Sequence, residues 1–404
     1  MKTLLIVSAG VEAVSGIRIA KSMGLHVVVS DIDPSAPGFG VADDRLFAST
    51  YDIAGSVAAA RRYHEQIRPI DGVISVASDV PLTVASIASA LGLPGISVES
   101  AHLAADKLMM KQCFANKGVP IPWFSPVNSC EQLYDLGASQ GFPLVIKPVD
   151  SRGSRGVLRL TQDVDLEWAF NVAHQHSPTG RVMLENFLPG PQVSTESLVI
   201  DGVAYTPGFA DRNYEYIERF APHIIENGGQ LPSHLNAQTQ GAVCDLVQEA
   251  ALAMGIQNGV VKGDIVVTDG VPHIIEIAAR LSGGYFCTHE IPLNTGVDLV
   301  GSAIRQALGE HVSPEDLTPK WNRPVAQRYL FPPTGTVRTV TGADLFTDHP
   351  DVEYLEVRAS KGDAIGPMDS HPARAGVVIT TGETIASAIS LAQNVIDGIE
   401  IVVE

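Results

Sequence analysis

The first third of the chain alternates short apolar runs with stretches of helical period. This pattern predicts strands and helices in turn: a strand over Thr3–Ser8, a helix over Val14–Met23, and strands over His26–Ser30 and Gly72–Ala77 that flank a helix over Ile53–Ile67. Strand–helix–strand units of this length form a doubly wound parallel sheet. We therefore expect an α/β domain over residues 1–105.

Acidic residues follow two of these predicted strands. Asp31 and Asp33 come after the second strand, and Asp79 comes after the third. Ligands in such sheets bind at the carboxyl ends of strands, so these acids are candidates for a substrate cleft, although capping of the next helices is an equally good interpretation. Gly10 and Gly16 do not form the G-x-G-x-x-G fingerprint, so a dinucleotide site has little support.

The middle of the chain places basic residues beside glycines. A helix beginning near Ser100 carries Lys107 and Lys111, which form either a solvated basic face or a phosphate site. A strand over Phe142–Pro148 then brings Lys147 next to the small, basic loop Ser151–Gly156. Glycines allow backbone N–H groups to approach phosphates closely, and a lysine supplies a point charge.

A hairpin with two acids lies further along. Two β-branched runs, Ile265–Val267 and His273–Ile277, flank Asp269-Gly270, which is a strong turn signal. A three-residue connection would place Asp264 opposite Glu276, with Cβ atoms roughly 4.5–5.5 Å apart, whereas a two-residue turn would place them on opposite faces. Paired carboxylates repel unless a cation lies between them, and Mg²⁺ held jointly with nucleotide phosphates is the usual solution. Solvated acids on an edge hairpin are the alternative.

Composition narrows the classes of function. The net charge of −18 repels nucleic acid and anionic membranes, so neither is an expected partner. The four cysteines are scattered without a C-x-x-C pair, which favours buried, reduced thiols and no zinc. No apolar run is long enough for a signal core or a membrane span. We expect a cytoplasmic protein, and a homodimer is compatible with the sequence.

The series of motifs resembles the ATP-grasp superfamily, in particular its carboxylate–amine ligases, such as the L-amino acid ligases, the large chain of carbamoyl-phosphate synthase and the purine-biosynthesis enzymes. The resemblance rests on the joint order of six segments: Asp106-Lys107, Val145–Pro148, Ser151–Gly156, Glu185–Gly190, Lys262–Asp264 and Ile275–Arg280. It implies a two-lobed α+β ATP-grasp body over residues 106–305 and a small α+β domain over 306–404, to which Arg374–Thr384 would belong.

The resemblance also implies roles for particular residues. ATP would be bound by Lys107, Lys147, Ser151, Gly153, Ser154, Gly156, Gln192 and a hinge of Glu185, Asn186, Phe187 and Leu188. Asp264 and Glu276 would bind Mg²⁺, with Mn²⁺ as an alternative ion. Arg280, together with Lys147, would be catalytic. The implied reaction joins a small carboxylic acid to an amine through an acyl phosphate, releasing ADP and phosphate.

The acceptor side is less well defined by sequence. The polar segment from Ala210 to Leu235 suits a pocket-lining loop, in which Arg212 is a candidate for binding a substrate carboxylate; Arg328 is a second candidate. Gly283 and Gly284, which follow the catalytic arginine, complete the predicted substrate site with Asp79.

Two positions depart from the family pattern. Gln192 stands where an acid usually holds the ribose, and an amide can still hydrogen-bond a hydroxyl. Ala278 stands where an asparagine usually provides a third metal ligand, and water would have to replace it. Two other functions therefore stay open: a carboxylase-type enzyme that forms carboxyphosphate, and a degenerate nucleotide-binding module without catalysis.

Overall fold

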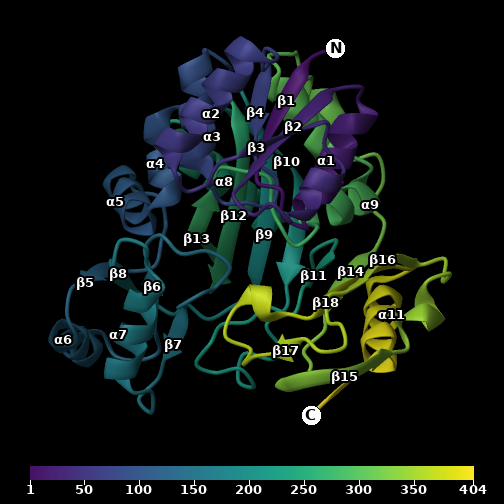
Figure 1. The fold of residues 1–404 in the computed structure, drawn as a ribbon. Coiled ribbons are helices and arrows are strands. Elements are labelled where there is room, and N and C mark those ends of the chain that lie inside the picture. The colour runs from purple at the N-terminus through teal and green to yellow at the C-terminus, as the bar shows by residue number, and fades with distance from the viewer.

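A parallel sheet with helices around it forms the N-terminal part of the molecule. The computed structural model describes residues 1–404, and this sheet lies at the top of Figure 1. Its strands are β1 (Thr3–Val7), β2 (His26–Asp31), β3 (Asp44–Phe47) and β4 (Gly72–Ile74), in the order β3-β2-β1-β4. The helices α1 (Ala13–Ser22), α2 (Ile53–Gln66) and α3 (Pro81–Leu91) connect or follow them. The predicted doubly wound parallel sheet is confirmed, with β3 as a strand that the pattern did not reveal.

The last of these strands is shorter than predicted. β4 ends at Ile74, and the chain then leaves the sheet to pair with another part of the molecule. Val76 forms a parallel bridge with Leu281, and the Ala77 N–H donates to the Leu281 carbonyl at 3.1 Å. This bridge fixes the edge of the N-terminal sheet, where Asp79 lies, against the segment that follows the acidic hairpin.

The predicted single helix near Ser100 is two helices. Ser97 caps α4 (Val98–Ala105), and Asp106 breaks the helix with an extended backbone before α5 (Lys107–Lys117). The Asp106 carboxylate accepts a hydrogen bond from the Met109 N–H at 2.9 Å, which makes Asp106 the N-cap of α5. As a result Lys107 occupies the first position of a helix.

A small antiparallel lobe, seen at the lower left of Figure 1, has its own core. Its strands run in the order β5-β8-β6-β7, and the helices α6 (Cys130–Gln140) and α7 (Leu166–Gln175) complete it. The strand bounds are Phe124–Val127 for β5, Leu144–Pro148 for β6, Leu158–Leu160 for β7 and Val182–Asn186 for β8. Lys147 and Glu185 therefore lie on neighbouring strands of one sheet.

A large antiparallel sheet occupies the centre of the molecule (Figure 1). Its order is β13-β12-β9-β10-β11-β14-β18-β16. The first five strands to appear in the chain are β9 (Gln192–Ile200), β10 (Val203–Arg212), β11 (Gly229–Leu231), β12 (Gly259–Thr268) and β13 (Val271–Ala278). Helix α8 (Ala237–Ala253) packs against β10, β12 and β13, while α9 (Ile291–Thr295) and α10 (Leu299–Ala307) follow β13.

In the acidic hairpin Asp264 pairs with Glu276, as one of the two predicted connections required, but the turn differs from that connection. The connection is the two-residue turn Asp269-Gly270, with positive φ at both positions, and not a three-residue connection. A bulge then shifts the register between Asp264 and Ile265, so Ile265 pairs with Ile274 while Asp264 pairs with Glu276. The two-residue turn alone would place Asp264 and Glu276 on opposite faces of the hairpin, and the one extra residue in β13 reverses this. The two carboxylates therefore do lie on the same face.

The C-terminal part continues the large sheet through β14 (Val325–Tyr329), β18 (Gly376–Thr381) and β16 (Val352–Val357). A smaller sheet consists of β17 (Ala364–Ile365), β15 (Gly335–Thr341) and β19 (Glu400–Val403), and α11 (Ile385–Gly398) packs on β14 and β18. Since the large sheet crosses position 305/306, the three-domain division stays a prediction. None of the helices combines the length and apolar character that a membrane span requires.

Candidate active site

One cavity of about 600 Å³ lies between the small lobe, the large sheet and the edge of the N-terminal sheet. That volume is typical of small-molecule sites. Most of the predicted site residues line it: Lys107, Lys147, Ser151, Gly153, Ser154, Glu185, Asn186, Phe187, Leu188, Gln192, Asp264, Glu276, Arg280, Arg212, Asp79, Gly283 and Gly284. Residues from distant parts of the sequence thus meet in one place.

Two predicted residues lie elsewhere. Gly156 is absent from the cavity lining, and a Cβ there would meet His176 at 2.8 Å, so its left-handed backbone serves close packing. Arg328 is also absent from the lining, because Gln327 and Tyr329 on β14 face the cavity and Arg328 points the other way. Its guanidinium donates to the carbonyls of Gly229 and Gln327. The cavity therefore lacks the second arginine that we predicted for binding a substrate carboxylate.

Two lysines share one buried carboxylate beside the cavity. Lys147 pairs with Glu185 at 2.5 Å, and Lys111 pairs with the other oxygen at 3.3 Å. Lys111 is fully buried and donates to the Ile274 carbonyl at 2.9 Å, so the solvated-face interpretation is wrong for this residue. Only Lys147 of the two lysines reaches the cavity lining.

This trio carries one uncompensated positive charge. Burial lowers the pKa of Lys111 to about 8, with Glu185 opposing the shift. Burial acts against ionisation of Glu185 as well, but Lys111 and Lys147 outweigh it and hold the pKa of Glu185 below its ordinary value. A positive charge held in a poorly solvated place attracts anions strongly. The trio is therefore suited to bind phosphate through Lys147.

The loop 151–156 follows β6, the strand that carries Lys147, and is fixed from three sides. Gly153 and Ser154 adopt left-handed conformations, which turn the loop sharply. Lys107 donates to the Ser151 carbonyl at 2.8 Å, Ser154 donates to the Ile224 carbonyl at 2.7 Å, and the Gly153 carbonyl accepts from the His371 N–H at 3.0 Å. The loop thereby connects the start of α5 with the segments around Ile224 and His371.

Each of the paired carboxylates has a cation as partner. Asp264 accepts from Ser194 at 2.9 Å and pairs with Arg212 and Lys262, while Glu276 pairs with Lys107 at 3.1 Å. Burial favours the neutral form of Asp264, yet Arg212 and Lys262 hold its pKa well below the ordinary value. Asp264 is therefore ionised.

The donor set fits a magnesium ion that shares its coordination with phosphates. No group of three or more His, Cys, Asp and Glu side chains is arranged to hold a metal alone. Mg²⁺ is commonly bound by one or two carboxylates plus substrate phosphates and water, so Asp264 and Glu276 would suffice. Ala278, also in the lining, offers no oxygen from its side chain.

Arg280 follows β13 and lies next to Asp79 of the N-terminal part of the chain. Its Nε is 3.7 Å from the Asp79 Oδ1, and both of these buried atoms lack a hydrogen bond. The next turn is held by Glu196, which accepts from the Ser282 N–H at 2.8 Å and from its hydroxyl. Burial raises the pKa of Glu196 to about 7. Glu196 thus positions the segment after Arg280, while the Arg280 guanidinium has unused hydrogen-bonding capacity.

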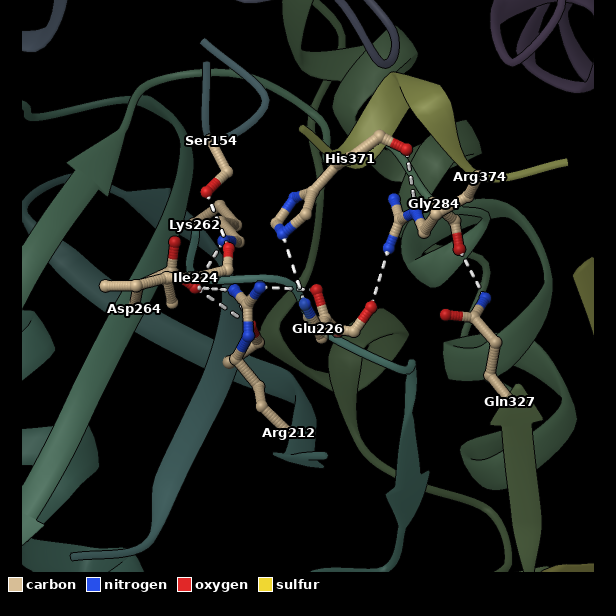
Figure 2. Close-up of polar contacts among 11 residues, drawn as sticks. Ser154, Arg212, Ile224, Glu226, Lys262, Asp264, Gly284, Gln327, His371 and Arg374 are labelled. Atoms are coloured by element: carbon tan, nitrogen blue, oxygen red, sulfur yellow. Dashed lines mark hydrogen bonds and ion pairs between the residues drawn. The ribbon is translucent and has the colours of Figure 1, made fainter. Parts of the chain in front are cut away.

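The other side of the cavity is built around Glu226, as Figure 2 shows. Arg212 binds the Glu226 carboxylate at 2.5 Å as well as Asp264, so it couples two acids instead of standing free for a substrate. The Glu226 N–H donates to His371 Nε2 at 3.4 Å, and Arg374 donates to the Glu226 carbonyl at 3.4 Å. Burial, and then Arg374, keep the pKa of His371 well below its ordinary value, which suits an accepting ring.

Glu12, Arg358, Glu290 and His371 also line the cavity, although sequence reasoning did not select them. Glu12 pairs with Arg358 at 3.1 Å and accepts from the Gly284 N–H at 2.8 Å. Glu12 follows β1, so the rule on the carboxyl ends of strands gave a signal for it. The other three lack any local motif. The cysteines are free; Cys287 is buried, whereas the other three are partly exposed, contrary to the expectation that all are buried.

A parallel α/β sheet, a separate small lobe and a large antiparallel sheet around one lysine-lined, acid-bearing cavity define the ATP-grasp class of fold. Residues 104–284 match the ATP-grasp domain family, and residues 328–404 match the family described as L-amino acid ligase C-terminal domain 2. The chain therefore contains an ATP-grasp domain, and it is an enzyme of the class of ligases that form carbon–nitrogen bonds.

Similarities to individual proteins extend over more of the chain than these two matches. The chain is 26% identical to the uncharacterized protein y4rH of Sinorhizobium fredii over 96% of this chain and 80% of that protein. It is 30% identical to a D-alanine–D-alanine ligase of Gloeobacter violaceus over 46% of this chain and 63% of the ligase. The structure of the L-amino acid ligase from Bacillus licheniformis superposes with a TM-score of 0.84 at 21% identity, covering 100% of this chain and 99% of that one. Phosphoribosylglycinamide synthetase from Anaerococcus prevotii has the same fold, with a TM-score of 0.76 at 18% identity and full coverage of both chains.

Proposed function

We propose that the protein joins a small carboxylic acid to an amine through an acyl phosphate, using ATP and Mg²⁺ and releasing ADP and phosphate. The observation that carries the proposal is the combination, in one cavity, of the Lys147 site, the paired acids Asp264 and Glu276, and Arg280. The match of residues 328–404 to an L-amino acid ligase domain supports amino acids as substrates.

The side chains would act mainly by positioning and by neutralising charge. Lys107 and Lys147 would bind the phosphate oxygens, and Asp264 with Glu276 would hold the metal, which supplies further neutralisation when it is bound. The substrate carboxylate attacks the γ-phosphorus, the bond to the β,γ-bridging oxygen breaks, and the leaving electron pair stays on ADP. Arg280, whose Nε has no hydrogen bond, would stabilise the charge that develops on the transferred group.

The second step replaces phosphate by the amine. The amine nitrogen attacks the acyl carbon, the bond from that carbon to the phosphate oxygen breaks, and the nitrogen loses a proton. Water must be kept out until the amine arrives. The loop 151–156 and the segment around Glu226 would provide that cover, because His371 and Ser154 join them over the cavity (Figure 2).

Hydroxylamine tests this proposal, since it is small enough to replace the amine. With ATP, Mg²⁺ and a panel of carboxylic acids, the hydroxamate of an accepted acid should accumulate together with equal ADP and phosphate. Arg280→Ala should suppress it, whereas Arg338→Ala, on an exposed side chain outside the cavity, should not.

Two other results would replace the proposal. ADP release that depends on bicarbonate, without any hydroxamate, would indicate a carboxyphosphate-forming enzyme. Binding of ATP without ADP release from any acid or bicarbonate would indicate a nucleotide-binding module, for which the missing ligand at Ala278 would be the cause.

A further inference from the structure

Glu290 is the one carboxylate in the cavity lining that has no partner. The other lining acids are Glu12, Asp79, Glu185, Asp211, Glu226, Asp264 and Glu276. Six of them have a cationic neighbour: Arg358 for Glu12, Arg280 for Asp79, Lys147 for Glu185, Arg212 for Glu226, Arg212 with Lys262 for Asp264, and Lys107 for Glu276. Asp211 accepts hydrogen bonds from Ser233 and from the His234 N–H instead. Glu290 is only 3% exposed, yet its carboxylate makes no hydrogen bond and no ion pair.

The backbone fixes where this carboxylate lies. Glu290 ends a short π-helix, Phe286–Glu290, that starts directly after Tyr285 and so continues the segment Arg280–Gly284. Its N–H donates to the Tyr285 carbonyl at 3.2 Å. π-helical turns are rare and are found frequently at functional sites. The same continuous segment therefore supplies Arg280, the two glycines and Glu290 to one wall of the cavity.

The electrostatic surroundings leave this acid in need of a cation. Burial raises the pKa of Glu290 to about 8, and Glu226 and Glu196 push it up while Arg212 and Arg328 pull it down. Arg212 is already bound to Asp264 and Glu226, and Arg328 donates to backbone carbonyls. Neither arginine contacts Glu290. A buried acid without donors is costly for the fold, so a donor brought by a ligand would be bound favourably.

From this geometry we propose that Glu290 binds the ammonium group of the acid substrate and so selects amino acids over plain carboxylic acids. The proposal rests on the proposed ligase function and assigns a residue to substrate selection. An ammonium group offers three donors and one charge, which a single carboxylate can neutralise. The reacting carboxylate of such a substrate would point towards Arg280, while its amino group would point towards the π-helix.

The test compares pairs of acids that differ only in the amino group. L-Alanine with propionate, L-leucine with 4-methylpentanoate and L-phenylalanine with 3-phenylpropanoate are each supplied with ATP and hydroxylamine, and kcat/KM for hydroxamate formation is measured. For wild type we expect the amino acid of an accepted pair to be preferred. In Glu290→Gln the value for the amino acid should fall about 10- to 100-fold, with little change for its deamino partner. Glu290→Asp should restore part of the preference, and Glu310→Gln, on an exposed acid outside the cavity, should change nothing.

Loss of the ratio, and not merely of activity, separates a specificity role from a structural one. The proposal is overturned if Glu290→Gln keeps the wild-type preference for the amino acid, or if wild type prefers the deamino acids. Failure of both kinds of acid to form hydroxamate, with wild type and all variants, would reject the ligase proposal instead.

In that case calorimetry with the same amino acids and ATP-loaded protein decides about Glu290. Near pH 7 its carboxyl group is largely protonated, so an arriving ammonium group should displace up to about one proton, seen as a dependence of the heat on the buffer. The dependence should vanish in Glu290→Gln. Equal binding and equal proton release by wild type and variant would overturn the ammonium site.

Discussion

Replacing Lys147 by methionine should separate nucleotide binding from folding. Lys147 reaches the cavity, while Lys111 binds the same carboxylate from within the core. Lys147→Met leaves Lys111 and Glu185 as a neutral buried pair, so no uncompensated charge remains and the fold should persist. Lys111→Met leaves Lys147 and Glu185 in the same way, which makes it a matched control with the same loss of charge.

The size of the effect follows from the hydrogen bonds that Lys147 would donate to phosphate. Hydrogen bonds to charged groups contribute about 1.5–3 kcal/mol each, so losing one should raise the Kd for ATP about 10- to 150-fold. If Lys147 also binds the transferred oxygens in the transition state, turnover should fall by a further factor on the order of 100 to 1,000. Lys111→Met should change the Kd by only a few fold, since it removes a charge near the phosphates but no contact.

Calorimetric titration with ATP and ADP measures the affinity, and chemical denaturation checks that both variants are folded. Equal weakening of ATP binding by the two variants would show that only the charge of the trio matters and not contact by Lys147. Unchanged affinity in Lys147→Met would remove this lysine from the nucleotide site altogether.

Two further predictions concern the metal and the buried lysine. Ala278→Asn should lower the Mg²⁺ concentration needed for half-maximal ADP release, because an amide oxygen would replace a water. Glu276→Gln should nearly abolish ADP release, and a fully active Glu276→Gln enzyme would contradict the metal assignment. Lys111 has a pKa of about 8 in the folded protein against 10.5 in the reference state, so between these pH values the unfolded chain holds one more proton than the folded protein. The stability of wild type relative to Lys111→Met should therefore rise with pH over this range, by about 3 kcal/mol. Denaturation of both proteins between about pH 7 and pH 10.5 measures this difference, and a flat difference would show that the pKa of Lys111 is not lowered in the folded state.

The local pattern of apolar and polar residues predicted most helices and strands, but not the helix break and the β-bulge between or within them. The periodicity of the first third predicted β1, α1, β2 and α2 to within a residue or two, because the two strands bury continuous apolar runs and the two helices bury residues at helical spacing. It missed the break at Asp106, where a capping interaction competes with helix continuation. It also missed the bulge in the hairpin, since one extra residue in β13 leaves the apolar alternation almost unchanged.

The residues that we propose for binding ATP were easier to select from the sequence than those that we propose for binding the substrate. Lys147 and the loop 151–156 lie on one lobe within a short span, so their chemistry is visible as local motifs. Glu290 and Arg358 join the cavity only in the folded chain, because their neighbours there are far away in sequence, so no local motif reveals them. Arg328 failed for a simpler reason: alternation along β14 turns it away from the face that Gln327 and Tyr329 share.

The ion pairs of the cavity suggest how the missing ligand at Ala278 can be tolerated. Lys107 pairs with Glu276, while Arg212 and Lys262 pair with Asp264, so each of the two proposed metal ligands already has a positive partner. Binding of metal and phosphates would then be an exchange: the lysine turns to the phosphate, and the carboxylate turns to the metal. The net gain depends on the difference between two sets of ion pairs, and one amide oxygen is a small part of that difference. On this reasoning Ala278 should weaken metal binding without preventing it, and the Ala278→Asn titration measures by how much.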